Sequence, residues 1–97
     1  MTLVILYQTI VKPNEIDTLN ELRAEFKTLY EKHNIDVVGH WNSQEEPNKN
    51  YYMARYLSDA DYQHKTRTLH NDENYLRLTA QLNEIRTDFK LERLTPQ

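Results

Sequence analysis

The apolar residues of the chain change their spacing along the sequence, and each spacing predicts a different element. Residues 2–11 are rich in Leu, Val, Ile, Tyr and Thr, with apolar side chains at both odd and even positions. This pattern is typical of a strand that is buried on both faces. Between Ile16 and Tyr30 the apolar residues recur at steps of three and four, which predicts a helix ending near residues 32–34.

The second half of the chain predicts a hairpin, a divided helix and a last strand. Residues 35–42 and 51–57 are β-type runs joined by a polar, proline-containing turn, as in a hairpin with a long loop. A helix follows and pauses at residues 70–71, where Asn71 or Asp72 can cap its second segment. Residues 88–94 alternate between polar and apolar side chains, as in a strand.

Short polar residues indicate where the helices begin. Pro13 suits a first helical turn, and we expect Asn14 or Asp17 to cap the first helix. Ser58 and Asp61 have the spacing of a capping box, with Asp in the place of the usual Glu. We therefore expect Ser58 to be the N-cap of the second helix.

The resulting order, β-α-β-β-α-β with the second helix split in two, predicts an α+β fold. The natural arrangement is a ferredoxin-like sandwich, in which the helices cover one face of a four-stranded antiparallel sheet. Residues 1–97 are expected to form this single domain. Since the strands are apolar on both sides, the uncovered sheet face would leave an exposed apolar patch. We expect a second copy to cover it, giving a homodimer through the open sheet face, a dimeric α/β barrel.

Composition excludes several classes of protein. Twelve Lys and Arg against fifteen Asp and Glu give a net charge of −3, which argues against a nucleic-acid-binding surface. The chain has no cysteine, so disulfides and thiolate metal sites are excluded, and its one glycine, Gly39, excludes glycine-rich nucleotide loops. No segment approaches the length of a membrane span, and the apolar start is expected to be a strand, not a signal peptide. We expect a cytoplasmic protein.

Four segments carry a resemblance to a known family. Residues 6–14, LYQTIVKPN, are similar to an L-R-x-Y-x-V-x-P-G opening, and residues 38–41, VGHW, to a V-G-x-[FW] strand. Residues 56–58, YLS, resemble the end of a W-x-Y-x-S motif, and Asp72 with Tyr75 has the spacing of D-x-x-W. In these features, which span essentially the whole chain, the sequence resembles the NIPSNAP family of the dimeric α/β-barrel superfamily.

The resemblance has consequences for fold and activity. It implies the fold predicted above and no cofactor, in a family whose molecular activity is mostly undefined. Neighbours in the superfamily include cofactor-independent monooxygenases, small-molecule isomerases and dehydratases, and haem-degrading enzymes. The chain departs from the family pattern at five positions, since Tyr7 replaces arginine, Thr9 tyrosine, Asn14 glycine, Ala54 tryptophan and Tyr75 tryptophan.

Polar residues on the strands are the candidates for chemistry in the barrel interior. His40 is the expected proton-transfer group because its ordinary pKa lies near neutral pH, and Tyr7 the expected hydrogen-bonding group beside the reacting atom. Arg55 is expected to hold an anionic group of the substrate, and Arg93 or Glu92 to join from the last strand.

Trp41 and Thr9 complete the set of predicted substrate-binding residues, with packing as the alternative role of Trp41. The four histidines show no H-x-x-x-H spacing, so no metal site is predicted. Three classes of function stay open at this stage. They are an enzyme acting on a small aromatic or acidic molecule, a ligand carrier with the same pocket, and a structural or protein-interaction dimer.

Overall fold

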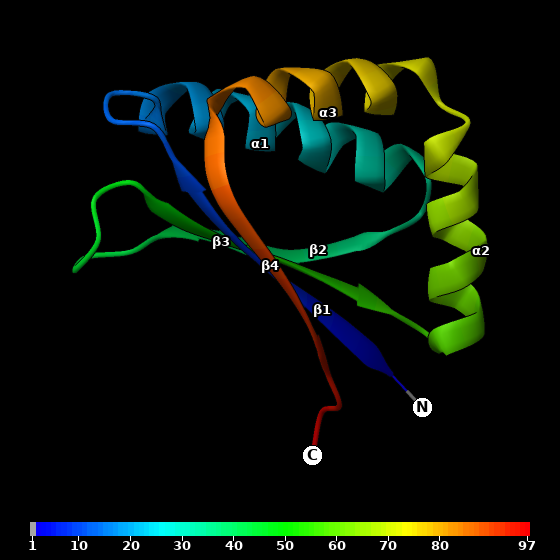
Figure 1. Ribbon diagram of the computed structural model, residues 1–97. Helices are drawn as coiled ribbons and strands as arrows, with labels where there is room; N and C mark the ends of the chain where they lie inside the picture. The colour runs from blue at the N-terminus through cyan, green and yellow to red at the C-terminus, as the bar shows by residue number, and fades with distance from the viewer. Residues whose placement is uncertain (1) are drawn as a thin grey trace.

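The computed structural model describes residues 2–97 and has the predicted order of elements, with the second helix divided (Figure 1). The strand ends lie within two residues of those expected from the sequence, an ordinary difference at element boundaries. The elements are β1 (Leu3–Val11), α1 (Ile16–Lys32), β2 (Asp36–Asn42), β3 (Lys49–Tyr56), α2 (Asp59–His70), α3 (Glu73–Ile85) and β4 (Arg86–Leu94).

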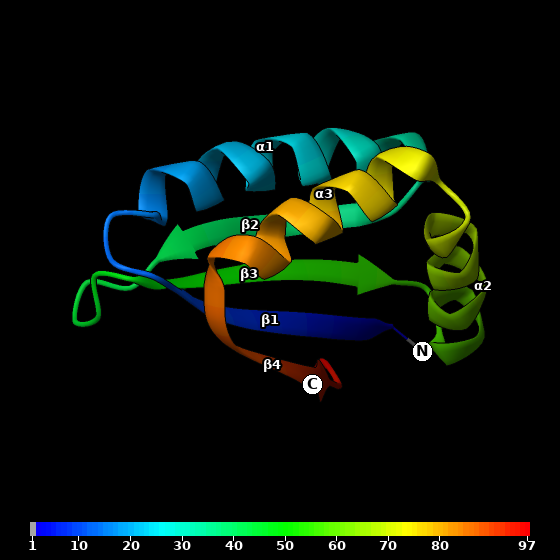
Figure 2. The ribbon, with the colours of Figure 1, turned by 45° about the horizontal axis from the view of Figure 1, so that its top comes forward.

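The four strands form one antiparallel sheet in the order β2-β3-β1-β4. Helices α1 and α3 lie over one face of the sheet, and α2 stands at its end (Figure 2). The opposite face carries no helix within the described chain. The ferredoxin-like α+β fold predicted from the element order is therefore confirmed.

The strand register assigns each side chain to one of the two faces. Tyr7 of β1 lies opposite Tyr52 of β3, and both point toward the helices. Side chains of the next residues along each strand, such as Leu6 and Met53, form the open face. This face is apolar at its centre, and Trp41 of β2, half exposed, adds to it.

The core lies between the sheet and the helices. The predicted apolar stripe of α1 is buried against the sheet, and α2 contributes only Leu69 to the fully buried set. No helix within residues 2–97 is long and apolar enough to cross a membrane. The buried hydrophobic residues are Ile5, Val11, Leu19, Leu22, Phe26, Leu29, Tyr30, Ile35, Tyr52, Ala54, Tyr56, Leu69, Leu78 and Leu82.

The start of α1 differs from the expectation. Its N-cap is Glu15, which makes no capping hydrogen bond through its side chain, so the expected caps at Asn14 and Asp17 are wrong. Asn14 instead has a φ of 69°, in the left-handed region that glycine and asparagine tolerate best. This conformation explains why asparagine can stand where the resembled family has glycine.

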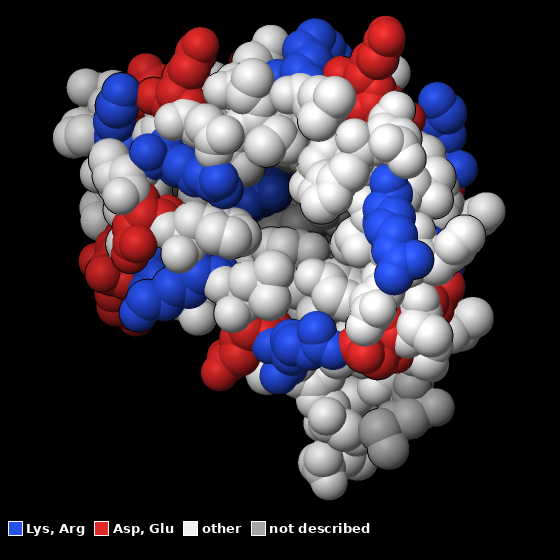
Figure 3. Space-filling view, turned by 45° about the vertical axis from the view of Figure 1, so that its right-hand side comes forward, with Lys and Arg blue, Asp and Glu red and all other residues white. Residues whose placement is uncertain are grey.

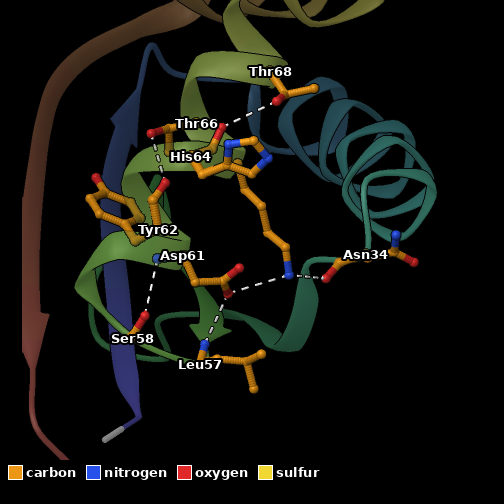
Figure 4. A network of polar contacts seen from close by, with 9 residues as sticks. Asn34, Leu57, Ser58, Asp61, Tyr62, His64, Thr66 and Thr68 are labelled. Atoms are coloured by element: carbon orange, nitrogen blue, oxygen red, sulfur yellow. Dashed lines mark hydrogen bonds and ion pairs between the residues drawn. The ribbon is translucent and has the colours of Figure 1, made fainter.

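The start of α2 is held by a network of polar contacts (Figure 4). Ser58 is the N-cap, as predicted, and its Oγ accepts a hydrogen bond from the Asp61 amide at 3.1 Å. The Asp61 carboxylate accepts from the Leu57 amide at 3.0 Å and pairs with Lys65 at 3.3 Å. Lys65 also donates to the Asn34 carbonyl at 2.7 Å, so the network joins α2 to the end of α1.

Candidate functional site

A cavity of about 320 Å³ lies between the sheet and the three helices. The face of the molecule shown in Figure 3 is hollowed, with basic side chains beside the hollow. The cavity wall comes from β1, α1, α2, α3 and β4, and it is largely aromatic and aliphatic. Its six aromatic side chains are Tyr7, Phe26, Tyr30, Tyr62, Tyr75 and Phe89.

The charged groups that line this cavity are all basic. Arg23 of α1 and Arg86 at the start of β4 belong to the lining, together with the imidazole of His70. No Asp or Glu of the described chain lines it. A few polar groups in a mostly apolar cavity are typical of a small-molecule site, and the volume lies at the small end of the range for such sites.

Arg23 is the most unusual residue of the site, because it is a buried guanidinium with an exposed fraction of only 4%. Its Nη2 donates to Oγ1 of Thr9 at 3.0 Å. Its Cζ lies 4.6 Å from the centre of the Tyr52 ring and 5.5 Å from that of Phe26, so aromatic faces hold it by cation–π contact. Burial lowers the pKa of Arg23 from its ordinary value.

The hydroxyls of Tyr7 and Tyr30 in the cavity stay neutral at physiological pH. Burial, followed by the neighbouring Tyr56, raises the pKa of Tyr7 above its ordinary value. Burial likewise raises the pKa of Tyr30 well above that value. Neutral phenols donate and accept hydrogen bonds but are poor bases, so Tyr7 can orient a ligand but is not suited to take a proton from it.

His40 faces the helices but lies outside this cavity. It lines a second cavity of about 250 Å³, on the other side of Arg23, together with Tyr52 and residues of β2. Its Nε2 lies 3.1 Å from Oδ1 of Asn20 on α1, so that nitrogen donates the hydrogen bond. Desolvation, and then the charge of Arg23, lower the pKa of His40. The imidazole is therefore neutral at physiological pH.

The structure does not bring the five predicted site residues together. Tyr7, Thr9 and His40 lie on the helix-covered face, but Arg55 and Trp41 lie on the open face of the sheet. The expected convergence of Arg55 with Tyr7 and His40 is therefore wrong. Each strand turns successive side chains to opposite faces, so a single step in register separates them.

The contacts of the remaining predicted residues suggest structural roles. Arg55 pairs with Asp36 of β2, its Nε lying 2.9 Å from Oδ2, and both side chains are exposed. Thr9 is fully buried beneath Arg23 and fixes the guanidinium. Arg93 contacts Asp59 and the Tyr62 ring.

A groove between α1 and α3 has a similar volume, but its Arg77 lies 3.6 Å from Glu25, so these charges already neutralise each other. Within residues 2–97 no group of three or more His, Asp or Glu side chains could hold a metal ion.

Sequence reasoning missed Arg23, His70 and Arg86. For Arg23 a signal exists, because successive residues of a helix are about 100° apart. Viewed along the helix axis, the Arg23 side chain therefore lies between those of Tyr30 and Ile16, inside the apolar stripe. A charged residue inside such a stripe is either buried or interrupts the apolar face of the helix, and this makes it a candidate functional residue.

Comparisons with known proteins agree with this architecture. No family model matches the chain, and no curated protein sequence matches it. Among solved structures, a NIPSNAP family protein from Agrobacterium tumefaciens has a TM-score of 0.89 at 15% identity, covering 100% of this chain and 94% of that one. An uncharacterised NIPSNAP-like domain protein from Burkholderia xenovorans has a TM-score of 0.87 at 12% identity, covering 99% and 85%.

A third similar structure has a different description. An antibiotic biosynthesis monooxygenase has a TM-score of 0.77 at 16% identity, covering 98% of each chain. At these identities the likeness concerns the fold. The chain therefore has, over its full length, the fold of NIPSNAP family proteins and of this monooxygenase.

Proposed function

We propose that the protein binds a small aromatic molecule in the cavity between the helices and the sheet. The observation that carries the proposal is the lining, which combines aromatic rings with hydroxyl groups and a few basic groups. Burial of an aromatic ligand against these rings would supply the hydrophobic free energy of binding, and the hydroxyls would orient it. An antibiotic biosynthesis monooxygenase has a similar fold, which supports a small molecule as the ligand.

Two residues predicted from the sequence have a role in this proposal. Tyr7 would donate a hydrogen bond to the ligand from the floor of the cavity, and Thr9 would position Arg23 without contacting the ligand. Proton transfer by His40 stays a prediction, because His40 lines the neighbouring cavity.

A cavity-filling variant tests the proposal. We expect 2-naphthol, a neutral probe, to bind saturably to the purified chain and to raise its melting temperature, because a ligand of the native state stabilises it. Thr79→Phe, which places a ring in the cavity, should weaken this binding, whereas Thr18→Phe on the exposed side of α1 should not. Absence of naphthol binding, or equal binding by both variants, would contradict the proposal.

We also propose that two copies pair through the open sheet face. The support is the apolar centre of that face, where Trp41 is 49% exposed and Leu6 and Met53 are only half-buried in the single chain. Contiguous apolar surface of this kind is rare on a monomer. Since the cavity opens on the other side of the sheet, pairing and ligand binding would use different faces.

A further inference from the structure

We infer that the ligand is an aromatic carboxylic acid whose carboxylate binds the Arg23 guanidinium. This inference rests on the proposed function, because it names the chemical class of ligand for the same cavity.

Among the described residues, Arg23 is a buried cation without an anionic partner. None of the ion pairs between described residues includes it, and its one side-chain hydrogen bond goes to the neutral Thr9 hydroxyl. Its buried Nε–H has no hydrogen-bond partner within residues 2–97. Buried charges in proteins are usually paired, because an unpaired charge in an apolar environment is costly. An anionic ligand would supply the missing partner.

The surroundings of Arg23 favour a planar anion. The guanidinium is held against the Tyr52 and Phe26 rings, and the planar fork of an arginine matches the two oxygens of a carboxylate. Phe26 also belongs to the wall of the cavity. A carboxylate attached directly to an aromatic ring would therefore place its charge at Arg23 and its ring among the aromatic side chains.

A second cation strengthens the argument. Arg86 lines the same cavity, with its Cζ 4.6 Å from the centre of the Phe89 ring, and it too takes part in none of the described ion pairs. Burial is the main cause of the lowered pKa of Arg23, and the charge of Arg86 lowers it further, against the opposite effect of the neighbouring tyrosines. With no acidic residue in the lining, one ligand carboxylate would relieve this repulsion.

The inference is tested with two probes of nearly equal shape, 2-naphthoate and its neutral amide, 2-naphthamide, by titration calorimetry on the full chain. We expect naphthoate to bind about tenfold or more tightly than naphthamide, the factor typical of a hydrogen-bonded charge pair. In Arg23→Gln this preference should disappear, while naphthamide should still bind. Arg86→Gln should reduce the preference, and Arg67→Gln, on the exposed side of α2, should leave it unchanged.

Three outcomes separate this inference from the proposed function. Equal binding of naphthoate and naphthamide to the natural chain would overturn the inference and leave the aromatic cavity intact. Binding of neither probe would overturn both. Tight binding of inorganic phosphate that competes with naphthoate and is lost in Arg23→Gln would show a general anion site and overturn the carboxylate class. The two-probe comparison needs no variant, so it decides the inference even if Arg23→Gln fails to fold.

Discussion

Nε2 of His33, at the end of α1, lies 2.8 Å from Oδ2 of Asp72, the residue that caps α3. The other carboxylate oxygen of Asp72 accepts a hydrogen bond from the Asn74 amide at 2.8 Å. One carboxylate therefore begins α3 and joins it to α1. The hydrogen bond from His33, followed by that from the Asn74 amide, lowers the pKa of Asp72.

This contact predicts how stability depends on acidity. The pKa of Asp72 is lower in the folded chain than in the unfolded chain, so the ionised carboxylate stabilises the folded chain. This stabilisation is complete above the unfolded pKa of about 3.9. The contribution disappears as the pH falls through the folded value. We expect Asp72→Asn, which keeps a capping side chain, to be less stable than the natural chain at neutral pH and to approach it in acid.

Urea denaturation of both proteins across this range measures the effect. Glu21→Gln, at an exposed position in the middle of α1, is the control, and it should follow the natural chain more closely. A stability difference between Asp72→Asn and the natural chain that is independent of pH would contradict the prediction.

The cap of α2 gives a second prediction. Ser58→Ala removes the acceptor of the Asp61 amide and should lower the free energy of unfolding by about 1 kcal/mol. The measurement is chemical denaturation, with Thr68→Ala inside the same helix as the control, since alanine there favours the helix. Equal stabilities of Ser58→Ala and the natural chain would mean that the Ser58 hydroxyl does not stabilise α2.

The open sheet face gives a third prediction. The natural chain should sediment with about twice its mass of 11.7 kDa at micromolar concentration, and Met53→Glu should sediment as a monomer because it places a charge in the apolar interface. Leu76→Glu, at a site on α3 that is 53% exposed, should leave the dimer intact. A natural chain that sediments as a monomer under these conditions would rule out the proposed pairing.

The course of the chain was predictable because it depends on local signals. The spacing of three and four in α1, the Ser58 cap and the break at residues 70–71 each involve residues close in sequence. The faces of the strands depend on pairing between distant segments. In β2 an irregularity between Val37 and Gly39 shifts the register and so turns His40 toward the helices. The sequence of residues 35–42 contains no pattern that predicts this irregularity.

The candidate site was predictable only in part, for the same reason. Tyr7 lines the cavity, but Arg55 alternates with the buried residues Ala54 and Tyr56 and so points to the other face. The basic residues of the cavity come from α1, α2 and β4, which are remote from one another in sequence. Their proximity results from the way the helices pack on the sheet, and strand patterns contain no information about it.

Helices α1 and α2 differ in how many of their side chains are buried, and this difference affects how readily the wall of the cavity opens. Helix α1 has six buried side chains and α2 only one, Leu69, yet α2 supplies part of the cavity wall. Segments with few buried contacts open at a lower free-energy cost than the core, so backbone amides of α2 should exchange with solvent deuterium sooner than those of α1. Within α2, the first turns, held by the contacts of Ser58, Asp61 and Lys65, and the turn around the buried Leu69 should exchange more slowly than the rest of the helix.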